Sequence, residues 1–230
     1  MIFAGIIKTS LIDYPGKIAT VLFTPGCNYN CFYCHNRSLI EDFNELVSVD
    51  EIEDFLKKRQ GLIDGVVITG GEPTLHADLI AFFKKIKDLG YFTKLDSNGS
   101  NPEIINACVQ AKVVDYFAID YKAPSEKYSE ICRGDANPSK VLDTINLLLK
   151  YNQDFEVRTT VIPQLSIEDL IKMSEELPQI PRYVLNPYQK PFNFLEKDQK
   201  FIDVPPYSEK QIAEFAETLK LYQPNVVLLF

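Results

Sequence analysis

Three cysteines lie within one short stretch of the chain, close enough to bind a single metal centre. Cys27, Cys31 and Cys34 occur in Thr-Pro-Gly-Cys-Asn-Tyr-Asn-Cys-Phe-Tyr-Cys-His-Asn, residues 24–36. Thiolates are soft ligands that favour iron–sulfur clusters, zinc or copper over harder cations. A four-iron cluster held by three cysteines keeps one iron without a protein ligand, and chemistry can occur at such an open position. The stretch therefore predicts a metal centre that has room for a further ligand.

Two other interpretations of these thiols are open. A structural zinc site would use Cys27, Cys31, Cys34 and His35, although such sites usually divide their ligands between two separated pairs. A disulfide is disfavoured, because three clustered cysteines cannot pair off and no feature indicates an oxidising compartment. The spacing favours a cluster, and a non-catalytic zinc or redox-sensing module is the alternative from another class.

Further polar motifs occur where apolar, strand-like runs end. They are Thr69-Gly70-Gly71-Glu72-Pro73, Asp96-Ser97-Asn98-Gly99 and Asp120-Tyr121-Lys122. In parallel α/β folds, ligands bind beyond the carboxyl ends of the strands. We therefore expect these motifs to share one pocket with the cysteine loop.

The spacing Cys27-x3-Cys31-x2-Cys34, with Tyr33 before the last cysteine, resembles the signature of the radical S-adenosylmethionine (SAM) superfamily. Together with the other motifs and Arg158-Thr159-Thr160-Val161-Ile162-Pro163, the pattern resembles the activating enzymes of glycyl-radical proteins. The similarity is closest to those of anaerobic ribonucleoside-triphosphate reductase, with those of pyruvate formate-lyase as near relatives. A radical SAM enzyme acting on a small molecule, such as a 7-carboxy-7-deazaguanine synthase, is the alternative.

The resemblance implies an oxidoreductase of anaerobic metabolism that reductively cleaves SAM to a 5′-deoxyadenosyl radical. That radical would abstract hydrogen from a glycine of a partner glycyl-radical enzyme, and an electron donor such as flavodoxin or ferredoxin would supply the electron. By resemblance, Cys27, Cys31 and Cys34 hold a 4Fe–4S cluster whose open iron binds SAM. The residues implied for SAM are Tyr33, Gly70, Gly71, Glu72, Asp96, Ser97, Asn98, Lys122, Arg158 and Gln189.

These residue types suit their expected roles. Glycines let a ligand lie against bare backbone, and the Glu72 carboxylate can accept hydrogen bonds from an ammonium group. Lys122 can meet the SAM carboxylate as a point charge. Arg158 lies inside an apolar run, where an unpaired charge is costly, so it should face the pocket or a carboxylate.

Two expectations about the pocket come from the resemblance alone. Asp96 and Asp120 are candidates for a monovalent cation site, since matching acidic residues surround such a cation in pyruvate formate-lyase activating enzyme. Gln189 stands where that enzyme carries a ribose-contacting histidine, and this departure leaves the ribose contact open.

The rest of the chain alternates apolar runs with amphipathic helical patterns. Six strands are expected, over 18–23, 65–69, 91–95, 113–119, 155–161 and 183–185. Helices are expected to begin at capping signals such as Ser48 with Glu51 and Asn101 with Pro102. This alternation predicts an α/β fold, a partial (β/α)6 TIM-like barrel with a parallel sheet, and the alternative is a doubly wound open sheet.

Length and composition fit a single domain over residues 1–230, with 46% apolar residues. A net charge of −8 disfavours a nucleic-acid partner, because a phosphate backbone requires a clustered basic face. No run approaches transmembrane length and no signal peptide is present, so we expect a cytoplasmic protein. Cys108 is expected to be a buried apolar residue and Cys132 an idle thiol.

Overall fold

The computed structural model describes residues 1–41 and 46–229, and these residues form one sheet of eight strands. The strands are β1 (Gly5–Ser10), β2 (Ala19–Thr24), β3 (Gly65–Gly70), β4 (Phe92–Ser97), β5 (Tyr116–Asp120), β6 (Phe155–Val161), β7 (Tyr183–Pro187) and β8 (Val226–Leu228). β1 pairs antiparallel with β2, and all later neighbours are parallel. The strands lie in chain order, whereas a doubly wound sheet reverses order at a switch point. The partial barrel is therefore confirmed.

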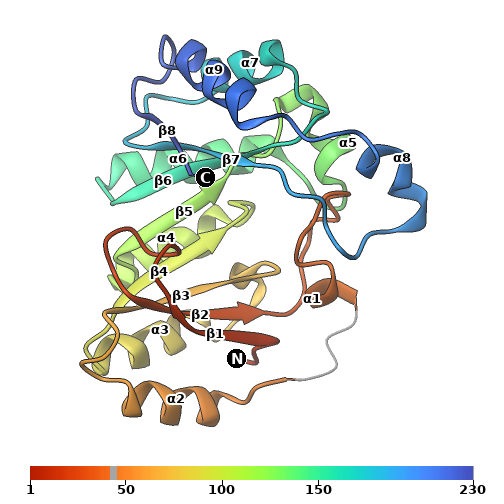
Figure 1. The fold of residues 1–230 in the computed structure, drawn as a ribbon. Helices are drawn as coiled ribbons and strands as arrows, with labels where there is room; N and C mark the ends of the chain where they lie inside the picture. Colours follow the sequence, from red (N-terminus) through yellow and green to blue (C-terminus); the bar gives the residue numbers. More distant parts are fainter. Residues whose placement is uncertain (42–45, 230) are drawn as a thin grey trace.

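Long helices cover the outer face of this curved sheet (Figure 1). They are α2 (Val49–Lys58), α3 (Leu79–Asp88), α4 (Pro102–Ala111), α6 (Pro138–Lys150), α7 (Ile167–Glu176) and α9 (Glu209–Leu219). Shorter helices lie in the loops that follow β2, β5 and β7: α1 (Ser38–Glu41), α5 (Tyr128–Cys132) and α8 (Gln199–Ile202). The 3-10 turns are η1 (Pro73–Leu75), η2 (Ser125–Lys127) and η3 (Glu196–Asp198).

Side-chain capping bonds open four of the long helices in the described residues, α2, α6, α7 and α9, but neither α3 nor α4. Ser48 and Glu51 form the expected capping box at α2, and Asn137 with Pro138 opens α6. Asn101 precedes α4 but makes no capping bond. Its side-chain amide instead donates to the Thr74 hydroxyl at 2.8 Å, which ties the start of α4 to the turn after β3.

Six strands were expected, and β1 and β8 add one to each end of the sheet. Both are edge strands with a single neighbour; β1 turns polar at Lys8, and β8 lies in the short apolar run that starts at Val226. Half of β1 is exposed, and β8 has only three residues. The prediction therefore captured the central strands and missed the two edges.

A small apolar group closes the amino-terminal end of the barrel interior. Tyr14, in the loop between β1 and β2, packs with Ala19, Val21 and Val67. Its ring lies 6.0 Å from that of Tyr116. Within the described part of the chain, no helix combines the length and apolar character needed to cross a membrane.

We expect Tyr14→Ala to lower the free energy of unfolding by roughly 3 kcal/mol, because it leaves a cavity beneath the barrel. Ile12→Ala, on the same loop at a side chain that is 86% exposed, should change it by less than about 0.5 kcal/mol. Urea unfolding of the three proteins measures both values. Equal losses in the two variants would contradict a role for Tyr14 in closing the barrel.

Candidate active site

One cavity of about 200 Å³ lies beyond the carboxyl ends of the central strands and brings most of the predicted residues together. The loop after β2 contributes the three cysteines and Tyr33, and the ends of β3 to β6 contribute the polar groups. The predicted residues at its wall are Cys27, Cys31, Tyr33, Cys34, Gly70, Gly71, Asp96, Ser97, Asn98, Asp120, Lys122 and Arg158. Segments far apart in the sequence thus form one pocket, as the strand-end positions indicated.

The three thiols surround this cavity. Burial raises the pKa of Cys27 to about 12 and also raises that of Cys34, so a bound metal must displace their protons. Among residues 1–41 and 46–229, no three His, Cys, Asp or Glu side chains are grouped as ligands of a metal ion. Thiols spread around the wall of a cavity suit a group larger than one ion.

Two glycines allow the end of β3 to approach the start of the cysteine loop. Gly70 has a φ of +122°, and a Cβ there would lie 2.3 Å from the backbone nitrogen of Thr24. A Cβ on Gly71 would lie 1.8 Å from the carbonyl oxygen of Gly26. The Glu72 amide then donates to that same oxygen at 2.8 Å. The glycine motif therefore permits close contact between two loops. From the sequence, these glycines were expected only to let a ligand lie against bare backbone.

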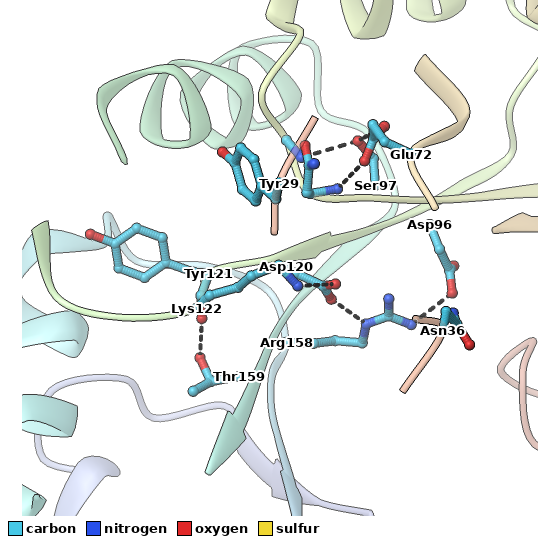
Figure 2. A network of polar contacts seen from close by, with 12 residues as sticks. Tyr29, Asn36, Glu72, Asp96, Ser97, Asp120, Tyr121, Lys122, Arg158 and Thr159 are labelled. Carbon is cyan, nitrogen blue, oxygen red and sulfur yellow. Dashed lines mark hydrogen bonds and ion pairs between the residues drawn. The ribbon is translucent and has the colours of Figure 1, made fainter. Parts of the chain in front are cut away.

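Glu72 is the predicted residue whose surroundings differ most from expectation. Its side chain is fully buried and is not at the cavity wall. One carboxylate oxygen accepts hydrogen bonds from the Thr74 hydroxyl at 2.6 Å and the Ser97 hydroxyl at 2.8 Å, and the other accepts from the Asn98 amide at 2.7 Å. Burial raises its pKa against these bonds. The carboxylate thus joins the loops after β3 and β4 (Figure 2).

A chain of alternating charges crosses the inner face of β4, β5 and β6. Figure 2 shows the Arg158 guanidinium between two carboxylates, with Nη1 2.8 Å from Asp96 and Nε 3.0 Å from Asp120. Lys94 binds the other oxygen of Asp96 at 2.6 Å, and Lys122 binds the other oxygen of Asp120 at 2.9 Å. Three cations pair with two carboxylates, so this row of five side chains carries a net charge of +1.

The place of each cation in this row of ion pairs decides whether it can bind a ligand. Lys94 is buried at the amino-terminal side, whereas Lys122 and Arg158 are at the cavity wall. Burial opposes ionisation of Asp120, but Lys122 and Arg158 outweigh it and lower its pKa to about 2. The surplus charge is thus available to an anionic group in the cavity.

Tyr33 lies at the cavity wall, and its hydroxyl is enclosed by protein. Its side chain is only 5% exposed and borders the cavity. Within the described residues, its hydroxyl has no hydrogen-bond partner. The hydroxyls of Tyr29, Tyr128 and Tyr188 are buried in the same way, so this feature does not by itself point to a ligand.

Some residues lie elsewhere or were missed. Gln189 is exposed and is not at the cavity wall, so its ribose contact stays a prediction. Arg37 was missed, although it is buried and donates to the carbonyl of Cys31 at 2.8 Å. Lys94 was also missed, although its spacing of two from Asp96 puts both on one face of β4.

Comparison with known proteins gives clear matches. The model of the radical SAM superfamily matches residues 21–177. A putative glycyl-radical enzyme activating enzyme of Methanocaldococcus jannaschii is 35% identical over 98% of this chain and 94% of its own length. A pyruvate formate-lyase-activating enzyme of Streptococcus mutans is 29% identical over 77% of this chain and 73% of its own.

Solved structures share the fold. SuiB of Streptococcus suis bound to S-adenosylmethionine superposes with a TM-score of 0.70 at 14% identity. The match covers 91% of this chain and 52% of SuiB. The protein anSMEcpe with bound AdoMet gives a TM-score of 0.64 at 18% identity, covering 89% of this chain and 60% of its own. At such identities the likeness concerns the fold.

We expect Glu72→Gln to lower the free energy of unfolding by about 1–3 kcal/mol, because an amide NH2 would replace one of two buried acceptor oxygens. Glu103→Gln, at an exposed carboxylate in the first turn of α4, is the matched control and should leave stability nearly unchanged. Denaturant unfolding at neutral pH compares the variants. If both behave as the wild type does, the Glu72 carboxylate does not hold the two loops together.

Asp120 should contribute about 2 kcal/mol of stability at neutral pH, because its pKa falls from 3.8 to about 2 on folding. A depressed carboxylate pKa stabilises the fold above the unfolded value, and this contribution is lost as pH falls from about 4 to about 2. We therefore expect Asp120→Asn to be less stable than wild type at pH 7, with a difference that shrinks across that interval. Urea unfolding against pH is the measurement, and a constant difference would contradict the ion-pair argument.

Proposed function

The chain belongs to the radical SAM superfamily and to its glycyl-radical enzyme activating enzymes, and we propose that it generates a radical on a glycine of a partner enzyme. The observation that carries this proposal is the single cavity that joins three cysteines to Lys122 and to the backbone of Gly70 and Gly71. A soft thiolate set beside a surplus positive charge suits a metal cluster next to a ligand that bears a carboxylate.

Cys27, Cys31 and Cys34 are the proposed ligands of a 4Fe–4S cluster. Their thiols border one cavity, and thiolates are the protein ligands of such clusters. A reduced cluster held by these residues would supply the electron for cleavage of SAM to methionine and the 5′-deoxyadenosyl radical. The protein holds SAM in place and keeps water away from it.

Lys122 is the proposed partner of the SAM carboxylate. Lys122 is at the cavity wall. It is the last side chain in the row of ion pairs, which carries a net charge of +1. The backbone at Gly70 and Gly71 is the proposed site for the SAM ammonium, since carbonyl oxygens can accept its hydrogen bonds. Tyr33 lies at the same wall, and its backbone is the proposed contact of the SAM adenine.

The remaining predicted residues have proposed roles that follow from their partners. Ser97, Asn98 and Arg158 border the cavity and can contact SAM directly. Glu72 positions the first two of these instead of meeting the ligand, since its oxygens are already bonded to their loop. A monovalent cation at Asp96 and Asp120 would have to share oxygens that already bind Lys94, Arg158 and Lys122.

The first candidate for the partner is anaerobic ribonucleoside-triphosphate reductase, on the motif resemblance described above. Pyruvate formate-lyase is the second, because relatives at 29–30% identity are named as its activating enzymes. A small-molecule reaction of the 7-carboxy-7-deazaguanine synthase type is the third. Flavodoxin or ferredoxin is the proposed electron donor, and the cytoplasm is the proposed location.

The activase proposal is tested with protein loaded anaerobically with iron and sulfide. Incubation with SAM, dithionite and either glycyl-radical enzyme of the source should give 5′-deoxyadenosine, together with a glycyl-radical signal in electron paramagnetic resonance from the true partner. Cys31→Ala should lose the cluster and both products. Cys108→Ala, at a buried thiol on α4 outside the cavity, should keep both.

The outcomes separate the candidates. A radical on only one of the two enzymes identifies the partner. Cleavage of SAM without a radical on either enzyme would favour the small-molecule alternative. Protein that takes up zinc but neither iron nor sulfide, and does not cleave SAM, would remove the proposal.

A further inference from the structure

Lys94 is a buried lysine inside the barrel whose charge has no place in the predicted site. Its side chain is 2% exposed, and its ammonium binds one carboxylate oxygen of Asp96 at 2.6 Å. Lys94 is in register with Val67 of β3 and Tyr116 of β5, which both pack in the apolar group that closes the amino-terminal end of the barrel. Asp96 is at the cavity wall, but Lys94 is not. Lys94 therefore lies between that apolar group and the cavity.

Stability alone does not account for a lysine at this position. A charge taken out of water costs free energy, and a buried ion pair often stabilises a protein no more than apolar side chains of similar volume do. An apolar residue at position 94 would extend the neighbouring apolar group, which already contains Tyr14, Ala19, Val21 and Val67. What Lys94 supplies, and an apolar residue would not, is one positive charge.

That charge sets the sign of the row of ion pairs described above. With Lys94 the row carries a net charge of +1, and without it the two remaining cations would only balance the two carboxylates. The neighbouring ion pair does not alter this sum, because Glu156, on the face of β6 that carries Arg158, binds Arg182 at 3.1 Å. The positive charge that the row offers to a ligand therefore depends on Lys94.

Lys94 also keeps the carboxylate of Asp96 occupied on both oxygens. Oδ1 accepts from the Lys94 ammonium, and Oδ2 accepts from Nη1 of Arg158 at 2.8 Å. Burial opposes the charge of Arg158, but Asp96 and Asp120 outweigh it and raise the pKa of Arg158. Because Asp96 is at the cavity wall, an Oδ1 without Lys94 would be a charged acceptor without a partner beside the ligand. Such an oxygen would repel a carboxylate.

We propose that Lys94 is a positioning residue for the carboxylate of the bound ligand. It touches no ligand, but it neutralises Asp96 from the side away from the cavity, so that the charge of Lys122 is available at the cavity wall. The ligand class is an amino acid, or an amino-acid conjugate, with a free carboxylate. This inference rests on the proposed function only in taking SAM as that ligand, and it does not depend on which enzyme or small molecule receives the radical.

The first test compares the affinities of SAM and decarboxylated SAM for anaerobically loaded protein, by equilibrium dialysis without a reductant. Lys94→Met keeps most of the side-chain length and removes its charge. It should weaken SAM binding by about tenfold, the order expected for one unit charge in a low-dielectric interior. Decarboxylated SAM should bind as well as to wild type, or better. The ratio of the two affinities does not depend on the fraction of protein that is folded.

Two further variants separate the charge of Lys94 from its packing. Lys94→Met/Asp96→Asn removes both charges of the pair and returns the row to a net charge of +1, so it should regain most of the lost SAM affinity. Lys87→Met is the matched control, because it removes the cation of an ion pair with Asp115 at 2.6 Å, at a lysine that is 33% exposed and outside the cavity wall. It should bind both ligands as the wild type does.

The second test varies the salt instead of the protein. Wild type should bind SAM equally well in the chlorides of Na⁺, K⁺ and tetramethylammonium at one ionic strength. The reason is that Lys94 already occupies the Asp96 oxygen that a small cation would need.

Each contrary result has a distinct meaning. Equal losses of SAM affinity in Lys94→Met and Lys87→Met, equal losses for the two ligands, or no recovery in the double variant would overturn the proposal. A wild-type affinity for SAM that requires Na⁺ or K⁺ would also overturn it, since a bound ion would then supply the charge. Loaded wild type that binds no SAM would overturn the proposed function together with this inference. Protein that binds SAM as expected but forms no glycyl radical would contradict the activase proposal alone.

Discussion

The backbone of the cysteine loop is fixed by hydrogen bonds that come from outside the loop, and the placement of the other functional groups follows from them. The Glu72 amide binds the carbonyl of Gly26, and the Asp135 amide binds that of Asn28. Arg37 donates to the carbonyl of Cys31. A loop with little regular structure of its own can hold three thiols around one cavity only if such partners fix it beforehand. One of these partners, Glu72, follows the end of β3, which lines the cavity through Gly70 and Gly71.

Burial of charge is the second constraint on this region. An unpaired charge inside the barrel would be costly, and every member of the row of ion pairs has a partner of opposite sign. The row consists of Lys94, Asp96, Arg158, Asp120 and Lys122. Glu72 is different, because hydroxyl and backbone amide donors satisfy its carboxylate. The two kinds of pairing have different roles. Neutral donors to Glu72 join the loops after β3 and β4, whereas the ion pairs place Lys122 at the cavity wall.

The sequence predicted the central strands, the caps of α2 and α6 and the strand-end position of the polar motifs, because these features depend on local pattern and on the rules of parallel sheets. It missed the direction of the Glu72 side chain. The local sequence after a strand does not determine whether a side chain there faces a ligand or an adjacent loop. It also missed the backbone hydrogen bond from Asn30 of the cysteine loop to Cys132. That contact depends on how the loops after β2 and β5 pack together, and no local periodicity reports it.

The two residues that flank Cys27, Gly26 and Asn28, are each approached closely by a glycine from another loop. Gly71 brings the loop after β3 to Gly26, and Gly134 brings the turn after α5 to Asn28, each at a distance that a Cβ would prevent. Hydrogen bonds follow at both contacts, since bare backbone lets an amide reach the carbonyl. The chain is thus held from two directions next to its first cysteine, while the sulfur of Cys27 faces the cavity wall. The open direction that remains is the cavity itself, which a ligand can enter without displacing any of these contacts.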